Sequence, residues 1–275
     1  MIESMVRVGG HATRYLEAGD RANETVLLLH DGAWGGSSSV TWGNSIGALA
    51  QHFHVLAPDL LGFGGTDKVV YFDRSTYEPR IDHVTRFLAS VGVDRPVHVV
   101  GNSFGGSLAL RMLAHPGRPA LRSVTSINGT GGPWRTPTAL EDLSRWDGSE
   151  SDLDRIVAQL IEPFDGWDDQ IRERMRWAAA PGHYRSVASV GVPVPDGLKE
   201  ERPTDPWPQQ LRDTDTPVLL IAGTRDTLLE PGWTDHFALL GDRLSVATLD
   251  ARHEPNIDRP DILVPVLLEF LSRTT

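Results

Sequence analysis

The sequence predicts an α/β protein with a mostly parallel sheet and an inserted segment of helices. Two observations lead to this fold class: short apolar runs alternate with amphipathic stretches along most of the chain, and the alternation stops in one long central segment. Each run is rich in apolar or β-branched residues and is bounded by Gly, Pro or Asp, as buried strands are. Strands that alternate with helices form parallel sheets covered on both faces.

Six runs predict strands, at residues 26–30, 53–59, 97–102, 123–128, 218–223 and 244–250. Apolar residues spaced three and four apart predict helices around residues 43–51, 78–92, 104–114, 231–240 and 260–272. We therefore expect a core made of residues 1–133 and 209–275, with residues 134–208 as a helical cap.

The predicted cap contains three helical patterns without strands between them: RTPTALEDLSRW, LDRIVAQLIEPF and DDQIRERMRWAAAPG. Five of the eight tryptophans also fall in it: Trp134, Trp146, Trp167, Trp177 and Trp207. One interpretation is a lid whose large side chains cover a pocket. The other is that each tryptophan packs the small core of the insert itself, and this is the more common role of a single buried tryptophan.

The composition is that of a globular protein that binds small molecules. A formal net charge of −11 over 275 residues argues against nucleic acid or an acidic membrane as a partner, because both require a basic surface. The absence of Cys excludes thiol nucleophiles and thiolate metal sites, and no metal or cofactor is expected. The sequence has neither a membrane-length apolar run nor a signal-peptide pattern, so we expect a cytoplasmic location.

The strongest chemical signal is the stretch VVGNSFGG at residues 99–106. A predicted strand leads directly into GxSxG and then into a predicted helix, which is the pattern of a nucleophile elbow centred on Ser103. An ordinary turn serine is the alternative, and the flanking strand and helix patterns disfavour it.

A serine hydroxyl needs a base within hydrogen-bond reach and an acid that orients the base. Asp226 follows the strand VLLIAG, and His253 follows the last strand, LSVATLD. The order nucleophile, acid, histidine is the one associated with a nucleophile elbow. Asp250 and Asp258 flank the histidine in sequence and remain alternative acids, although neither follows the expected strand.

Acyl transfer also needs N–H donors for the developing oxyanion. The stretch VLLLHDGAWGG places a Gly-rich turn directly after a strand, so Gly32 N–H and Phe104 N–H are the expected donors. His30 ends that strand, and its expected role is to brace the loop.

The order of these elements resembles the α/β-hydrolase superfamily over roughly the first 133 and last 65 residues. The resemblance implies the α/β-hydrolase fold, with a mostly parallel eight-stranded sheet and an inserted helical cap. Within the superfamily, the chain looks like the meta-cleavage-product hydrolases of aromatic degradation. The matching residues are Trp42, Asn44, Asp59, Gly62, Phe63, Gly64, Asn102, Ser103, Gly105 and Gly106.

That family cleaves a carbon–carbon bond in vinylogous 1,5-diketones formed by ring fission, and it must hold the distant carboxylate and enol oxygen of its substrate. The resemblance assigns this task to Asn102 and to an arginine of the cap. Arg174 is our candidate, and the neighbouring Arg172 and Arg176 point from other faces of the helix. The resemblance also implies a homodimer.

Three departures from the family pattern concern the substrate. Glu254 follows the histidine where the family has Trp, which adds a charge that opposes an anionic substrate or raises the pKa of His253. Asp31 replaces a Gly of the oxyanion loop, and Trp34 replaces a small residue or Pro. We expect Trp34, Asn44 and Glu254, with Asn102 and Arg174, to contact the substrate.

Other functions stay open on the sequence alone. The main alternative is an esterase, lactonase or thioesterase of secondary metabolism, because the three departures leave the triad intact but change the expected substrate contacts. A dehalogenase or epoxide hydrolase with an aspartate nucleophile is disfavoured, because residue 103 is Ser. A ligand-binding protein without catalysis is a third class, since fold does not dictate function.

Overall fold

A single eight-stranded sheet forms the centre of the computed structural model, which describes residues 1–72, 74–192, 195, 197 and 204–274. The strand order is β1-β2-β4-β3-β5-β6-β7-β8. The strands are β1 (Ile2–Val8), β2 (His11–Ala18), β3 (Thr25–Leu29), β4 (His54–Pro58), β5 (Val97–Asn102), β6 (Leu121–Ile127), β7 (Val218–Gly223) and β8 (Leu244–Leu249). All pairs from β4 to β8 are parallel, whereas β2 pairs antiparallel with both β1 and β4. The predicted fold class is confirmed.

The helices of the core cover both faces of the sheet. They are α1 (Ser38–Trp42), α2 (Ile46–Leu49), α3 (Glu78–Ser90), α4 (Phe104–Met112), α9 (Pro255–Asp258) and α10 (Pro260–Arg273), with 3₁₀ helices η3 (Gln209–Leu211) and η4 (Trp233–Arg243). Alternate residues of β3 enter different cores: Leu27 and Leu29 pack with α3, α4 and η4, and Val26 and Leu28 pack with α1, α2 and α10. This two-residue period explains why the strand is apolar at every position.

The hairpin of β1 and β2 has no counterpart among the six strands predicted from apolar runs. β1 is an edge strand and is mostly exposed, so its sequence IESMVRV alternates with polar residues. The predicted helix at residues 231–240 is the 3₁₀ helix η4, which is kinked at Gly241.

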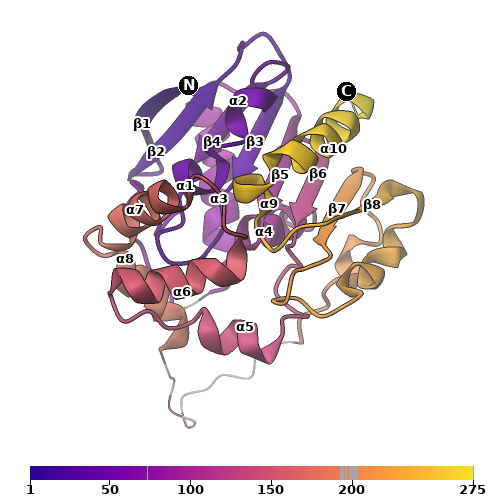
Figure 1. The fold of residues 1–275 in the computed structure, drawn as a ribbon. Helices are drawn as coiled ribbons and strands as arrows, with labels where there is room; N and C mark the ends of the chain where they lie inside the picture. The colour runs from indigo at the N-terminus through magenta and orange to yellow at the C-terminus, as the bar shows by residue number, and fades with distance from the viewer. Residues whose placement is uncertain (73, 193–194, 196, 198–203, 275) are drawn as a thin grey trace.

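The chain between β6 and β7 contains α5 (Pro137–Asp142), α6 (Glu150–Leu160), α7 (Trp167–Ala178), α8 (His183–Ala188) and η1 (Ser189–Gly191). Figure 1 shows these helices gathered at one end of the sheet, away from the two chain termini. Trp146 joins α6 and α7 in a separate apolar cluster, which supports the packing interpretation for this residue. The boundaries 134–208 drawn for the cap stay a prediction.

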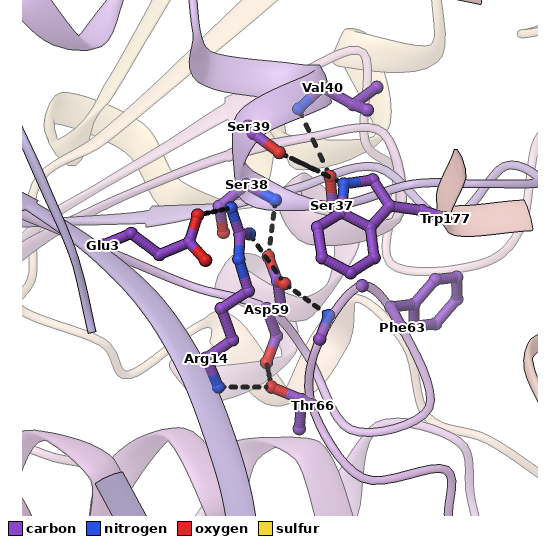
Figure 2. A network of polar contacts seen from close by, with 12 residues as sticks. Glu3, Arg14, Ser37, Ser38, Ser39, Val40, Asp59, Phe63, Thr66 and Trp177 are labelled. Carbon is purple, nitrogen blue, oxygen red and sulfur yellow. Dashed lines mark hydrogen bonds and ion pairs between the residues drawn. The ribbon is translucent and has the colours of Figure 1, made fainter. Parts of the chain in front are cut away.

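Asp59, directly after β4, connects several segments (Figure 2). Its carboxylate accepts hydrogen bonds from Arg14 Nη1 at 2.9 Å, from the Ser38 N–H at 2.7 Å and from the Gly65 N–H at 2.8 Å. The Arg14 guanidinium also lies 4.7 Å from the ring centre of Trp177 in α7. The network therefore holds the loop after β4 against both α1 and the cap. Within the described ranges, no helix has the length and apolarity needed to cross a membrane.

Candidate active site

Ser103 lies in a strained turn between β5 and α4. Its backbone has φ 54° and ψ −114°, a conformation that a non-Gly residue rarely adopts. The turn requires glycines on both sides: a Cβ on Gly101 would lie 2.1 Å from the Gly105 carbonyl oxygen, and one on Gly105 would lie 2.2 Å from the Leu29 carbonyl oxygen. This close approach raises the serine side chain above the carboxyl end of the sheet.

Ser103, His253 and Asp226 form a continuous hydrogen-bonded series. Ser103 Oγ lies 2.7 Å from His253 Nε2, and His253 Nδ1 lies 2.7 Å from Asp226 Oδ2. Burial of the imidazole lowers its basicity, but the Asp226 carboxylate outweighs this effect and raises the pKa of His253 above its usual value. The arrangement is suited to accept a proton from the serine hydroxyl and to stabilise the resulting imidazolium.

The two alternative acids have other partners. Asp250 pairs with Arg225 at 2.9 Å, and Asp258 accepts a hydrogen bond from the Glu162 N–H at 2.7 Å. Of the three candidate acids, Asp226 is the one that lies against His253 in the described part of the chain.

Two asparagine side chains fix the backbone of the histidine loop. Asn102 Nδ2 and Asn128 Nδ2 donate to the His253 carbonyl oxygen at 3.0 Å and 2.9 Å. Asn128 ends the run SVTSIN, has a positive φ of 48° and was not among the predicted site residues. A polar residue directly after a parallel strand, at the edge where the nucleophile lies, is the signal that could have identified it.

A cavity of about 650 Å³ opens beside the nucleophile. Its lining includes Ser103, His253 and both predicted oxyanion donors, Gly32 and Phe104. A Cβ on Gly32 would lie 2.8 Å from Phe104 Cβ, so the absence of a side chain lets these loops meet. Phe104 is the first residue of α4, and its N–H has no carbonyl partner within the helix.

His30 braces this loop as expected. Its Nδ1 lies 2.6 Å from the Asp31 carbonyl oxygen, and its Nε2 accepts a hydrogen bond from the Leu60 N–H at 2.9 Å. Burial lowers the pKa of the ring, which keeps it neutral and fit to accept that bond.

The residues expected to contact the substrate do not line this cavity: they are Asn102, Arg174, Trp34, Asn44 and Glu254. Asn102 turns toward the histidine loop, as described above. The Trp34 indole packs against Trp146 and Tyr184 in the cap, with its N–H donating to the Leu143 carbonyl at 3.1 Å. Asn44 donates to the Ile257 carbonyl at 2.8 Å.

Arg174 is fully buried between two carboxylates, which corrects the expectation that it faces the pocket. Its guanidinium lies 3.1 Å from Asp31 Oδ1 and 2.9 Å from Glu254 Oε2. Arg172 and Arg176 on the same helix are exposed, so one of the three arginines turns inward, as the helical spacing predicted.

The two carboxylates of this cluster differ in protonation. Burial opposes ionisation of Asp31, but the charge of Arg174 and the hydrogen bonds from Thr41 and Arg174 outweigh it and lower the pKa of Asp31. Burial and the nearby Asp31 charge raise the pKa of Glu254 to about 8 despite the contact with Arg174. Asp31 and Arg174 are therefore the ion pair, and Glu254 is mostly a neutral acid at pH 7. A neutral Glu254 adds no charge beside His253, and this explains how the acid is accommodated there.

Arg80 in the first turn of α3 is a cavity residue that sequence analysis did not single out. A cation in the first turn of a helix opposes the helix dipole, and this is the signal that could have identified it. Among the described residues, no group of three or more His, Asp or Glu side chains is placed to hold a metal ion.

Comparisons with known proteins identify the family of the chain. A family model described as "Alpha/beta hydrolase family" matches residues 26–266. The 2-hydroxy-6-oxo-6-(2'-aminophenyl)hexa-2,4-dienoic acid hydrolase of Metapseudomonas resinovorans is 28% identical over 279 residues, covering 99% of this chain and 91% of the relative. The 2-hydroxy-6-oxo-2,4-heptadienoate hydrolase of Pseudomonas putida is 26% identical over 237 residues, covering 83% and 80%.

Among solved structures, a serine hydrolase involved in carbazole degradation superimposes with a TM-score of 0.78 at 26% identity, covering 98% of each chain. The resemblance to meta-cleavage-product hydrolases that the sequence motifs suggested is confirmed.

Proposed function

Because the chain belongs to the alpha/beta hydrolase family, we propose that it is a serine hydrolase that cleaves a carbon–carbon bond in a ring-fission product of aromatic degradation. The observation that carries the proposal is the full-length similarity to a dienoic acid hydrolase, which covers 99% of this chain. The hydrogen-bonded series of Ser103, His253 and Asp226 beside a 650 Å³ cavity supplies the chemistry such a reaction needs.

In this proposal, His253 takes the proton of Ser103 and later returns it to a leaving group. Asp226 holds the imidazole in the tautomer that accepts at Nε2 and stabilises its charged form. The N–H groups of Gly32 and Phe104 stabilise the oxyanion formed at the attacked carbonyl. The raised pKa of His253 suits a residue that must carry a proton between the two steps.

The substrate is a dienol with a carboxylate at one end and a ketone at the other. Transfer of the enol proton to carbon converts the dienol to its keto form, whose 2-keto group is the electron sink. Attack on the distant ketone then breaks its bond to the adjacent carbon, and the electron pair passes into the conjugated 2-keto acid to give an enolate, which is protonated to the enol acid. One water completes the hydrolysis, and the ketone carbon leaves as a carboxylic acid. The cavity must therefore hold both ends of one molecule.

The test is a comparison of kcat/KM for a 6-phenyl ring-fission dienoate and for a neutral phenyl ester. We expect wild type to consume the dienoate, seen as loss of its visible chromophore, and Ser103→Ala to lose several orders of magnitude of that rate. Turnover of the ester alone would contradict the proposal and favour the esterase alternative. Turnover of neither, together with no labelling of Ser103 by a fluorophosphonate, would favour a binding protein.

A further inference from the structure

The lining of the cavity is basic although the whole chain is acidic. Arg80, Arg135 and Arg145 contribute to the wall, and no Asp or Glu does so among the described lining residues. The chain as a whole has 37 acidic residues against 26 Lys and Arg. A lining of this charge favours an anionic ligand.

Arg80 differs from the other two because hydrogen bonds hold it in place and because it is only partly exposed. Its Nε donates to the Leu61 carbonyl at 3.0 Å, and its Nη1 donates to the Thr76 carbonyl and hydroxyl at 2.8 Å each. The guanidinium also lies over the rings of Phe63 and Phe104, 5.7 Å and 5.4 Å from their centres. Arg135 and Arg145, in contrast, are exposed.

The charge of Arg80 has no carboxylate partner within the described part of the chain. Burial lowers its pKa to about 10, and the groups that oppose this shift are the hydroxyls of Tyr71 and Tyr77. Its Nη2 makes no hydrogen bond with any described residue. Arg80 is partly buried, so its charge loses part of its hydration without gaining an anionic partner, and an anionic ligand would offset this loss.

Ser186 lines the same wall and carries a second unsatisfied polar group. Its side chain is 4% exposed, and its hydroxyl has no hydrogen-bond partner among the described residues. If Gly62 carried a Cβ, that atom would lie 2.4 Å from Ser186 Oγ and 3.3 Å from Arg80 Nη2. The two groups are thus neighbours on one side of the cavity.

We infer that Arg80, with Ser186 beside it, binds the carboxylate of the substrate, in place of the sequestered Arg174. Arg80 lies against Phe104, the residue that follows the nucleophile, so a carboxylate held there belongs to the molecule that Ser103 attacks. The inference rests on the proposed function for the identity of the substrate, but the charge of the ligand is testable without turnover.

The experiment measures binding to Ser103→Ala by calorimetry. The probes are sorbate, an unreactive dienoate, and hexa-2,4-dienamide, its neutral counterpart. Adding Arg80→Gln should weaken sorbate binding about 10- to 100-fold, as expected for a charge-assisted contact, and leave amide binding unchanged. Arg145→Gln, which removes an exposed arginine from the same lining, is the matched control and should weaken sorbate less than about threefold.

Because Arg80 also holds Leu61 and Thr76, Arg80→Lys is included as a variant that retains the charge, and it should recover part of the sorbate affinity. Equal losses on sorbate and amide, equal effects of Arg80→Gln and Arg145→Gln, or no sorbate binding to Ser103→Ala would overturn the inference. The carboxylate site and the proposed function can fail independently. If the protein is an esterase with an anionic substrate, the proposed function is wrong but sorbate still binds through Arg80. A carbon–carbon hydrolase that binds sorbate equally well without Arg80 would refute only the subsite.

Discussion

Replacement of Arg174 by Met should cost stability rather than remove a substrate contact. The arginine and both of its partners have fully buried side chains, so the change leaves the Asp31 carboxylate without its counter-charge. Asp31 would keep its hydrogen bonds from the Thr41 hydroxyl and the Ala33 N–H, at 2.6 Å and 2.8 Å, but these do not neutralise it. Breaking a buried pair in this way typically costs about 3–5 kcal/mol.

Urea unfolding followed by tryptophan fluorescence measures this cost, and a thermal melt should show a Tm lower by roughly 6–20 °C. The matched control is Arg172→Met on the same helix, whose side chain is 66% exposed and whose loss should change stability by less than about 0.5 kcal/mol. A triple variant, Asp31→Asn, Arg174→Met and Glu254→Gln, removes every charge of the cluster and should recover much of the lost stability. The reasoning is refuted if Arg174→Met retains wild-type stability within about 1 kcal/mol but loses dienoate turnover selectively.

Three further predictions concern the histidine loop. Asp226→Asn should lower kcat about 10⁴-fold with little change in stability, because the amide favours the wrong tautomer of His253; a kcat near wild type would reassign the acid. Asn128→Gly keeps the positive φ but removes a donor to the His253 carbonyl, and it should lower kcat about tenfold without a matching rise in KM. The pKa of Glu254 is raised from 4.5 to about 8, so its contribution to stability is complete below pH 4.5 and is lost as the pH rises to about 8. Glu254→Gln should therefore reduce the fall in stability between pH 5 and pH 9, by at most roughly 5 kcal/mol in urea melts, and an unchanged slope would argue against a neutral Glu254.

The sequence allowed prediction of the parts of the fold that are buried on both sides. β3 and β7 are almost wholly apolar and β5 is buried at every position because these strands contact helices on both faces, and such runs are recognisable without a structure. β1 and β2 form an edge hairpin with one exposed strand, and the alternating polar residues concealed them. The series of Ser103, Asp226 and His253 was predictable because each residue lies in the loop after a strand, at the same edge of the sheet.

The surroundings of the nucleophile were not predictable, because they depend on contacts between distant parts of the chain. Arg174 meets Asp31 and Glu254 from 143 and 80 residues away, and its helix pattern indicates which face is buried but not what lies opposite. The sequence pattern likewise indicates that Arg80 is a surface residue of an amphipathic helix. Its place in the cavity follows from the packing of α3 against the loop that contains Phe63.

The most direct test of the central claim identifies the products formed from a ring-fission dienoate. Purified protein is incubated with the 6-phenyl dienoate in H₂¹⁸O, and the mixture is analysed by mass spectrometry. We predict benzoate carrying one ¹⁸O and the five-carbon enol acid in equal amounts, with Ser103→Ala forming neither at a measurable rate. An unchanged dienoate, in the presence of active hydrolysis of a phenyl ester by the same preparation, would contradict carbon–carbon bond cleavage.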